Sequence, residues 1–125
     1  MFKTIMAIGA GSFIGGISRY LLSKGISGIG TPTFPWGTFV VNVLGCFLAG
    51  IVFGLFDKGS LKGDNLKMFL TVGFCGGFTT FSTFIHENYI LFSDKNFIHF
   101  VVYATLSFAI GLIVAHVGHM LVDSI

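Results

Sequence analysis

Charged residues are scarce in this sequence. Among 125 residues there are 7 Lys or Arg and 5 Asp or Glu, which gives a net charge of +2 with histidine neutral. A charge this small, scattered along the chain, is not typical of a protein that binds nucleic acid or an acidic partner. The two cysteines, Cys46 and Cys75, lie in apolar runs without a Cys-x-x-Cys spacing. This argues against a disulfide framework or a zinc site and favours simple burial.

Apolar residues dominate what is present. They make up 54% of the chain, with 16 Phe and 18 Gly, and the mean hydropathy is +0.91. A soluble domain of this size could not hide so much apolar surface in one core. The composition therefore indicates an integral membrane protein.

Four stretches are long enough to cross a bilayer as helices, which takes about 20 apolar residues each. They cover residues 4–23, 36–56, 68–92 and 97–122. The connections between them are short, and the first, from Lys24 to Pro35, is rich in turn residues. We therefore expect an all-α membrane protein, with a single domain of four transmembrane helices over residues 1–125.

The lysines give only a weak rule for orientation. Both chain ends and the loop 57–67 are expected on one side of the membrane with four lysines. The other side has two lysines, joined by Arg19 if it reaches the interface. Such a chain could insert either way up, and a fixed orientation with the lysine-rich ends inside stays open.

Small residues recur four apart in the spans, as in Gly11 with Gly15 and Gly73 with Gly77. This spacing lets helix backbones approach closely and predicts tight packing. Four helices packed in this way enclose no passage of their own. A transport pathway would therefore run along a groove or between two copies of the chain.

Two spans carry polar stripes. Thr38 and Asn42 are four apart in the second span, and Tyr103, Ser107 and Gly111 follow the same spacing in the fourth. Polar groups at membrane depth are costly and mark either function or contacts between helices. The spacing alone leaves both interpretations open.

The third span contains GGFTTFSTF at residues 76–84. Each glycine costs roughly 1 kcal/mol inside a helix, and Thr79 and Thr80 are β-branched. We therefore expect the helix to break at 76–80, near the middle of the membrane. A break frees backbone carbonyls, which persist at this depth only where protein or an ion satisfies them.

Phe81 and Phe84 follow the predicted break and share one helix face. The edge of a phenyl ring carries positive potential, so rings presented edge-on could line a path for an anion. Rings that face lipid or fill the core are the alternative. Neutral hydrogen-bond donors that suit a small, hard anion are also present. They are the Asn42 amide and the hydroxyls of Ser82, Thr83, Tyr103 and Ser107.

Few ionisable residues fall in the spans. Arg19 ends the first span, where it could attract anions into a vestibule or simply snorkel to the interface. Glu87 and His86, toward the end of the third span, could line an aqueous vestibule or form a solvated helix end. His116 and His119 are three apart, and we expect an interfacial pair because too few other ligands accompany them for a metal site.

Three motifs together resemble the Fluc, or CrcB, family of fluoride channels. They are GGISRY at 15–20, WGTFVVNVLGCFLAG at 36–50 and GFCGGFTTFSTFIHE at 73–87. The resemblance covers the whole chain, and the third motif is long and specific. It implies a passive channel that exports fluoride through the cell membrane of a microbe, as an antiparallel homodimer with dual topology and two pores.

The resemblance also implies roles for individual residues. Asn42, Phe81 and Phe84 would line the fluoride pore, with hydroxyls beside them from Ser82 and Thr83. Tyr103 and Ser107 would belong to a polar track on the fourth helix, Arg19 and Glu87 to the vestibule. A central sodium ion would be held by the backbone carbonyls of Gly76 and Thr79 from both subunits. One departure is Gly111, where some relatives carry another hydroxyl, so the resemblance does not extend to the outer end of the track.

Other classes of protein remain as alternatives. A small multidrug-type exporter coupled to protons needs a carboxylate deep in its first helix, and residues 4–18 contain none. A membrane assembly subunit that transports nothing would explain the glycines but would leave the polar stripes without a role. An enzyme is not expected, because no nucleophile and base pair or metal-ligand set is apparent at membrane depth.

Overall fold

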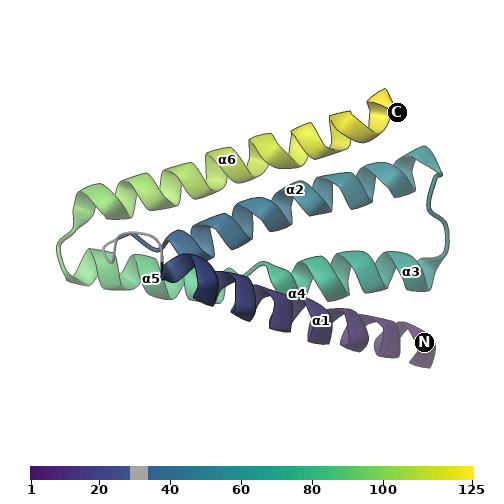
Figure 1. The fold of residues 1–125 in the computed structure, drawn as a ribbon, viewed down its shortest axis with the longest axis horizontal. Helices are drawn as coiled ribbons and strands as arrows, with labels where there is room; N and C mark the ends of the chain where they lie inside the picture. The colour runs from purple at the N-terminus through teal and green to yellow at the C-terminus, as the bar shows by residue number, and fades with distance from the viewer. Residues whose placement is uncertain (29–33) are drawn as a thin grey trace.

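The computed structural model describes residues 1–28 and 34–125, and its secondary structure there is helical. The chain crosses from one end of the molecule to the other four times, and both termini lie at the same end (Figure 1). The first two crossings are α1 (Phe2–Ser27) and α2 (Trp36–Lys58). The third consists of α3 (Asp64–Met68), η1 (Phe69–Cys75), α4 (Gly76–Phe78) and α5 (Ser82–Ser93). The fourth is α6 (Phe97–Ser124).

All four predicted spans are confirmed as helices long and apolar enough to cross a membrane. The first helix is longer than predicted, because α1 continues through Lys24 to Ser27. The connection to α2 is correspondingly shorter than the predicted 24–35, and its residues 29–33 lie outside the described part of the chain. Arg19 is therefore inside α1, eight residues before its end, and the prediction that it ends the first helix is wrong.

The third crossing is irregular, as predicted, and the helix is interrupted in the later part of the predicted stretch 76–80. Gly76 and Gly77 remain helical, and Thr79 is the residue that turns to an extended conformation, with ψ 160°. Before it, η1 is a π-helix, a form that is rare and often found at functional sites. The cost of a glycine in a helix is small, and here the close approach of α1 at Gly77 offsets it.

Glycines bring α1 directly onto the third crossing. A Cβ atom added at Gly11 would collide with the Phe69 carbonyl oxygen, and one at Gly15 with the Phe74 carbonyl oxygen. From the other side, a Cβ atom at Gly77 would lie 2.9 Å from the Ser12 carbonyl oxygen. Only glycine permits this contact, so the small-residue spacing in the sequence did predict the packing.

The second close pair is α2 with α6. A Cβ atom at Gly50 would collide with the Ala115 carbonyl oxygen, and one at Gly118 would lie 2.6 Å from the Phe47 carbonyl oxygen. The loop after α2 begins with Gly59, whose φ of +87° is accessible to glycine with little strain.

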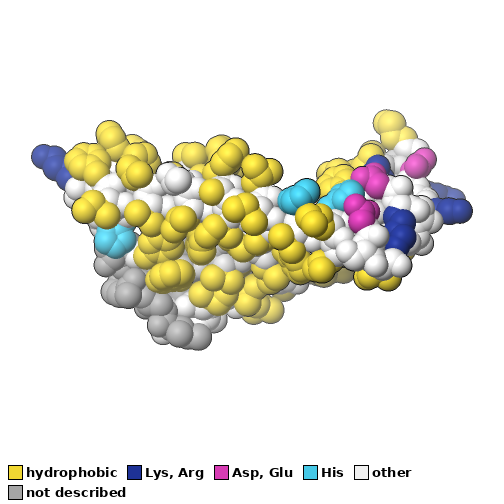
Figure 2. All heavy atoms as spheres, turned by 90° about the horizontal axis from the view of Figure 1, so that it is seen from above, with side chains coloured by type: hydrophobic (Ala, Val, Ile, Leu, Met, Phe, Trp, Pro, Cys, Tyr) yellow, Lys and Arg dark blue, Asp and Glu magenta, His cyan; other side chains and the backbone are white. Residues whose placement is uncertain are grey.

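The outer surface is apolar over the middle of the molecule, and most of the charged side chains in view gather at the end that holds the termini (Figure 2). Large side chains such as Phe13, Phe108 and Ile98 are at least 70% exposed. In water this would be a liability, whereas lipid tails cover such a surface without cost. The protein is therefore a multi-pass membrane protein.

Candidate functional site

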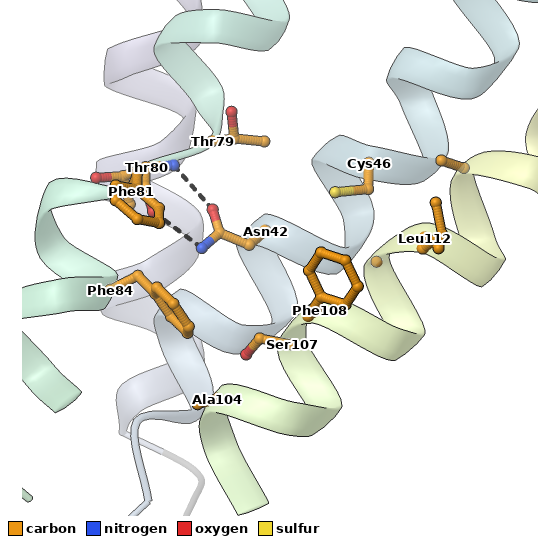
Figure 3. Close-up of a pocket in the computed structure, with 12 residues that line it drawn as sticks. Asn42, Cys46, Thr79, Thr80, Phe81, Phe84, Ala104, Ser107, Phe108 and Leu112 are labelled. Atoms are coloured by element: carbon orange, nitrogen blue, oxygen red, sulfur yellow. Dashed lines mark hydrogen bonds between the residues drawn. The ribbon is translucent and has the colours of Figure 1, made fainter. Parts of the chain in front are cut away.

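The break in the third crossing is held by Asn42 of α2. In a continuous helix the Thr80 N–H would bond to the Gly76 carbonyl; here it donates to Asn42 Oδ1 at 2.8 Å. The Asn42 Nδ2 atom donates in return to the Thr80 carbonyl at 3.0 Å (Figure 3). One side-chain amide thus satisfies both backbone groups of Thr80, and one N–H of Asn42 remains for another acceptor.

Threonine hydroxyls satisfy other backbone groups around the break. Thr79 Oγ1 donates to the Cys75 carbonyl at 2.8 Å. The Thr83 N–H, which would bond to the Thr79 carbonyl in a continuous helix, donates to Thr80 Oγ1 at 3.3 Å. The carbonyls of Gly76 and Thr79 have therefore each lost the N–H group that a regular helix would supply.

Arg19 reaches the same segment from α1. Its Nε atom donates to the Gly77 carbonyl at 3.1 Å, another carbonyl whose helical partner is removed by the break. Arg19 thus contacts the backbone at the middle of the third crossing, and its vestibule role stays a prediction.

A groove of about 550 Å³ lies beside the break, between α2 and α6 (Figure 3). It is lined by Asn42, Cys46, Thr79, Thr80, Phe81, Phe84, Ala104, Ser107, Phe108, Gly111, Leu112 and Ala115. None of these residues carries a charge, so the groove has an apolar surface interrupted by a few neutral polar groups. The sequence left open whether a pathway would run along a groove or between two copies of the chain, and the spans do form a groove on one face.

Four of the residues predicted to line a pore are brought together in this groove: Asn42, Phe81, Phe84 and Ser107. The Phe81 and Phe84 rings are 6.0 Å apart at an angle of 39°. The Ser107 hydroxyl is buried and has no hydrogen-bond partner among the described residues. A buried hydroxyl without a partner is a group that a ligand or water can satisfy.

Three other predicted residues do not line the groove. Ser82 is exposed, with its hydroxyl 3.5 Å from that of Thr80, and Thr83 uses its backbone N–H on Thr80. Tyr103 is fully buried, and its hydroxyl donates to Glu87 Oε1 at 3.0 Å. The Tyr103 ring lies 5.0 Å from that of Phe84, so Tyr103 supports a groove residue from behind.

Sequence reasoning missed several groove residues. Thr80 was noticed only as a β-branched residue, although its backbone is the partner of Asn42. Cys46 and Phe108 line the groove as well. Cys46 comes four residues after Asn42 and Phe108 directly follows Ser107, and these positions could have predicted that they lie near the same groove. Gly111 leaves the Cys46 sulfur exposed to the groove, since a Cβ atom there would lie 3.3 Å from it.

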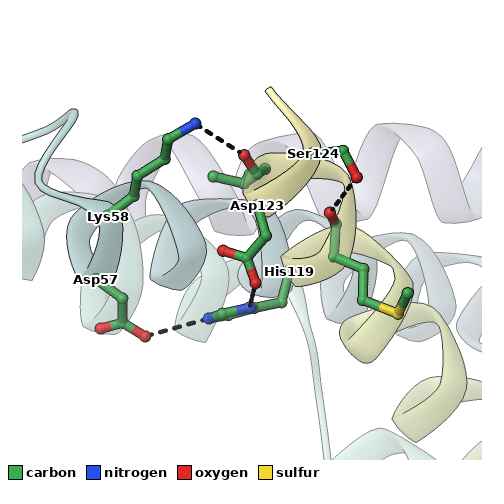
Figure 4. Close-up of polar contacts among 7 residues, drawn as sticks. Asp57, Lys58, His119, Asp123 and Ser124 are labelled. Carbon is green, nitrogen blue, oxygen red and sulfur yellow. Dashed lines mark hydrogen bonds and ion pairs between the residues drawn. The ribbon is translucent and has the colours of Figure 1, made fainter.

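The histidines predicted as an interfacial pair behave differently from each other. His119 contacts Asp57 Oδ2 at 3.2 Å and Asp123 Oδ2 at 3.3 Å, near a contact of Lys58 Nζ with the Val122 carbonyl (Figure 4). His116 is exposed. Among the described residues no group of three His, Cys, Asp or Glu side chains could hold a metal ion.

Four apolar crossings, a break held open by side chains and an uncharged groove beside it define a membrane protein of the type that passes small solutes or ions. The comparisons with known proteins agree. Residues 6–119 match the family model described as CrcB-like protein, Camphor Resistance (CrcB). The chain therefore belongs to the CrcB family.

Three relatives share the name Fluoride-specific ion channel FluC. The protein from Azobacteroides pseudotrichonymphae is 41% identical over 123 residues, which is 98% of this chain and 98% of the relative. Those from Phocaeicola vulgatus and Flavobacterium psychrophilum are each 40% identical over 116 residues, which is 93% of this chain and 95% and 94% of the relatives. These relatives are named as ion channels and not as enzymes, in agreement with the expectation from the sequence.

Proposed function

We propose that this protein is a channel that lets fluoride leave the cell passively across the cell membrane of a microbe. Relatives about 40% identical over nearly the whole chain are named fluoride-specific ion channels. The observation in the structure that carries the proposal is the lining of the groove, which combines hydrogen-bond donors with phenyl rings and has no charged side chain. A fixed cation would hold an anion too tightly, whereas neutral donors let it leave again.

The groove residues would work by replacing the water around the ion. Within the described part of the chain the Ser107 hydroxyl has no partner, and Asn42 keeps one N–H after its bonds to Thr80. Phe81 and Phe84 would present positive ring edges to an anion and give a cation no negatively charged group to bind. We propose Ser82, Thr83 and Tyr103 as supporting residues of this path, together with Glu87, because they lie behind or beside the groove.

A second copy of the chain would close the groove. Phe81 is 73% exposed and Phe108 is 76% exposed, although both line the groove, so one side of it is open in a single chain. An antiparallel homodimer would cover this side and, by symmetry, contain two such paths. The weak lysine bias of the sequence supports insertion in both orientations.

Sodium would be a structural ion at the break. The carbonyls of Gly76 and Thr79 fit this role, because the N–H groups of Thr80 and Thr83 are diverted to other acceptors. Two such carbonyls from each of two chains would supply four oxygen ligands, the ligand type that a hard monovalent cation prefers. The ion would supply a positive charge near the middle of the membrane, and the carbonyls would hold it in place.

A flux assay tests the channel function directly. Purified protein in liposomes loaded with fluoride should release it after addition of a potassium ionophore, without a pH gradient, and liposomes loaded with chloride should retain it. Release of organic cations driven by protons, with fluoride retained, would instead show a small multidrug-type exporter.

Cross-linking tests the dimer independently of flux. In a background with Cys46 and Cys75 changed to Ala, one chain carries Ser60→Cys and the other carries Asp94→Cys. A cross-link should form between these two cysteines only if the chains are antiparallel, because only then do both lie on the same side of the membrane. A membrane-impermeant reagent should then label each single variant from both sides of the membrane. Labelling of each variant from one side only would exclude the dual topology.

A further inference from the structure

Arg19 is a half-buried cation inside a membrane span. Its Nε atom donates to the Gly77 carbonyl at 3.1 Å. Within residues 1–28 and 34–125 no carboxylate lies within ion-pairing distance of it. An unpaired arginine at this depth is costly, so its contact with the break calls for an explanation beyond snorkelling.

The glycine stripe of α1 places Arg19 against the break. Gly11, Gly15 and Arg19 are each four residues apart, so they share one face of the helix. At the two glycines the backbone of α1 lies directly on the third crossing. A helical side chain leans toward the N-terminus of its helix, which takes Arg19 back along the same contact to Gly77.

The Gly77 carbonyl needs a new donor because of the break. In a continuous helix it would accept from the Phe81 N–H, but the extended Thr79 separates the two. An unpaired carbonyl in the membrane costs several kcal/mol by rough estimates for apolar media. Arg19 supplies the donor here, as Asn42 does for Thr80. The two side chains, from different helices, therefore decide which carbonyls of the break stay free.

We propose that Arg19 is a positioning residue of the break, which acts through the hydrogen bond from its Nε atom to Gly77 and not through its charge. The inference rests on the proposed function insofar as fluoride flux is one readout. It differs from the vestibule role expected from the sequence, in which the positive charge alone would matter and the contact with Gly77 would be incidental.

Three substitutions separate the hydrogen bond from the charge. Arg19→Gln places an amide nitrogen the same number of bonds from Cα as the arginine Nε atom, and so keeps the donor without the charge. Arg19→Lys keeps the charge but has a methylene group at that position. Arg19→Met has neither. Lys24→Gln, at the exposed end of α1, is the control for loss of one positive charge from the same helix.

The rate of fluoride efflux from liposomes should depend on whether residue 19 keeps an N–H donor at the position of the arginine Nε atom. We expect Arg19→Gln and Lys24→Gln to stay within about threefold of the unmodified protein. Arg19→Met, which has no donor at all, should fall about tenfold or more, as for loss of a hydrogen bond to a charged group, and Arg19→Lys, whose donors lie one bond further out, should fall between them. Wild-type flux in Arg19→Lys with reduced flux in Arg19→Gln would establish the charge role and overturn the proposal. Wild-type flux in all three variants would overturn it too.

A measurement on the unmodified protein tests the contact without flux. Arg19 is the single arginine of the sequence, so ¹⁵N-labelled arginine gives one guanidinium. With glycine carbonyls labelled by ¹³C, solid-state dipolar dephasing in bilayers should place one glycine carbonyl within about 4 Å of Nε, given ordinary hydrogen-bond lengths. No dephasing in the unmodified protein would exclude the contact, even if fluoride is conducted. If the unmodified protein conducts no fluoride, the channel proposal fails while this measurement still decides the role of Arg19.

Discussion

The pair of helices α2 and α6 is closed in one half and open in the other. Toward the C-terminal ends, Gly50 and Gly118 bring the backbones so close that an added Cβ atom would meet a carbonyl oxygen of the facing helix. Toward the N-terminal ends the same helices line the groove, with Asn42 on one and Ser107 on the other. The same pair of helices can therefore pack closely and still line a polar groove, because the close packing lies in one half of the pair and the groove in the other.

The two halves also differ in what holds them. In the closed half, the backbones of α2 and α6 are in van der Waals contact. At the end of this half, His119 of α6 makes an exposed contact with Asp57 of α2 and another with Asp123 of its own helix. In the open half, the half-buried Asn42 amide binds the broken third crossing to α2. Changes in the open half should therefore affect conduction, and changes in the closed half should affect stability.

The largest effect is expected for Asn42→Asp in the open half. The carboxylate could still accept from the Thr80 N–H but could not donate to the Thr80 carbonyl, and its charge would repel anions. Fluoride efflux should fall by about a hundredfold or more, since both an ionic repulsion and a lost hydrogen bond contribute. Asn88→Asp is the control, because Asn88 is buried more deeply than the half-buried Asn42 and lies in the third crossing outside the groove lining. Equal losses of flux in the two variants would show that any buried carboxylate disrupts the fold, and would return Asn42 to a purely structural role.

Phe84→Ile should reduce flux about tenfold or more, because an aliphatic side chain fills space without a positive edge. Phe81→Ile should have a somewhat smaller effect, since Phe84 packs on Tyr103 while Phe81 is 73% exposed in a single chain. Phe92→Ile, at the far end of α5 and outside the groove, should conduct normally. Normal flux in both groove variants would mean that these rings only fill space.

In the closed half, Gly50→Ala should lower the free energy of unfolding by about 1–3 kcal/mol, as for overpacking, because its Cβ atom would meet the Ala115 carbonyl. Gly111→Ala should cost less, since only the Cys46 sulfur lies nearby, at 3.3 Å. Gly16→Ala has nothing within 4 Å and should gain about 0.5–1 kcal/mol from helix propensity alone. Unfolding in detergent measures all three, and equal stabilities of the Gly50 and Gly16 variants would contradict the closed packing.

The smallest effect is expected at the exposed end. His119→Gln should leave fluoride flux unchanged and lower the unfolding temperature only slightly, because exposed ion pairs contribute little. The difference should vanish at high salt, which screens exposed charges. His116→Gln, on an exposed neighbour, is the control and should show no salt-dependent difference. A large loss of flux in the His119 variant would show that this end takes part in conduction.

Local patterns explain why much of the architecture was predictable. A bilayer has a set thickness, so four apolar runs of the right length predict four crossings, and all four are confirmed. Glycines four apart predicted the packing of α1 on the third crossing through Gly11 and Gly15. The motif GGFTTFSTF predicted a break, although the glycines themselves stay helical and the chain departs at Thr79.

The site was only partly predictable. Asn42, Phe81, Phe84 and Ser107 were candidates from their spacing, the family resemblance implied their place in a pore, and they do share the groove. Tyr103 has the same spacing on α6 as Ser107, yet it points to Glu87 and is fully buried. Helical periodicity says which residues share a face but not which neighbour that face meets, so it could not separate the two.

By itself, the sequence of this protein determined its membrane character, its four crossings, its close glycine contacts and the approximate place of the break. These follow from hydropathy, segment length and the size of a side chain, which are properties of residues near one another in the chain. Only the tertiary structure decided that Asn42 binds Thr80 and that Arg19 binds Gly77. Each of these contacts joins helices far apart in sequence, and a hydrogen bond depends on distances of a few tenths of an ångström that only the packing of whole helices sets.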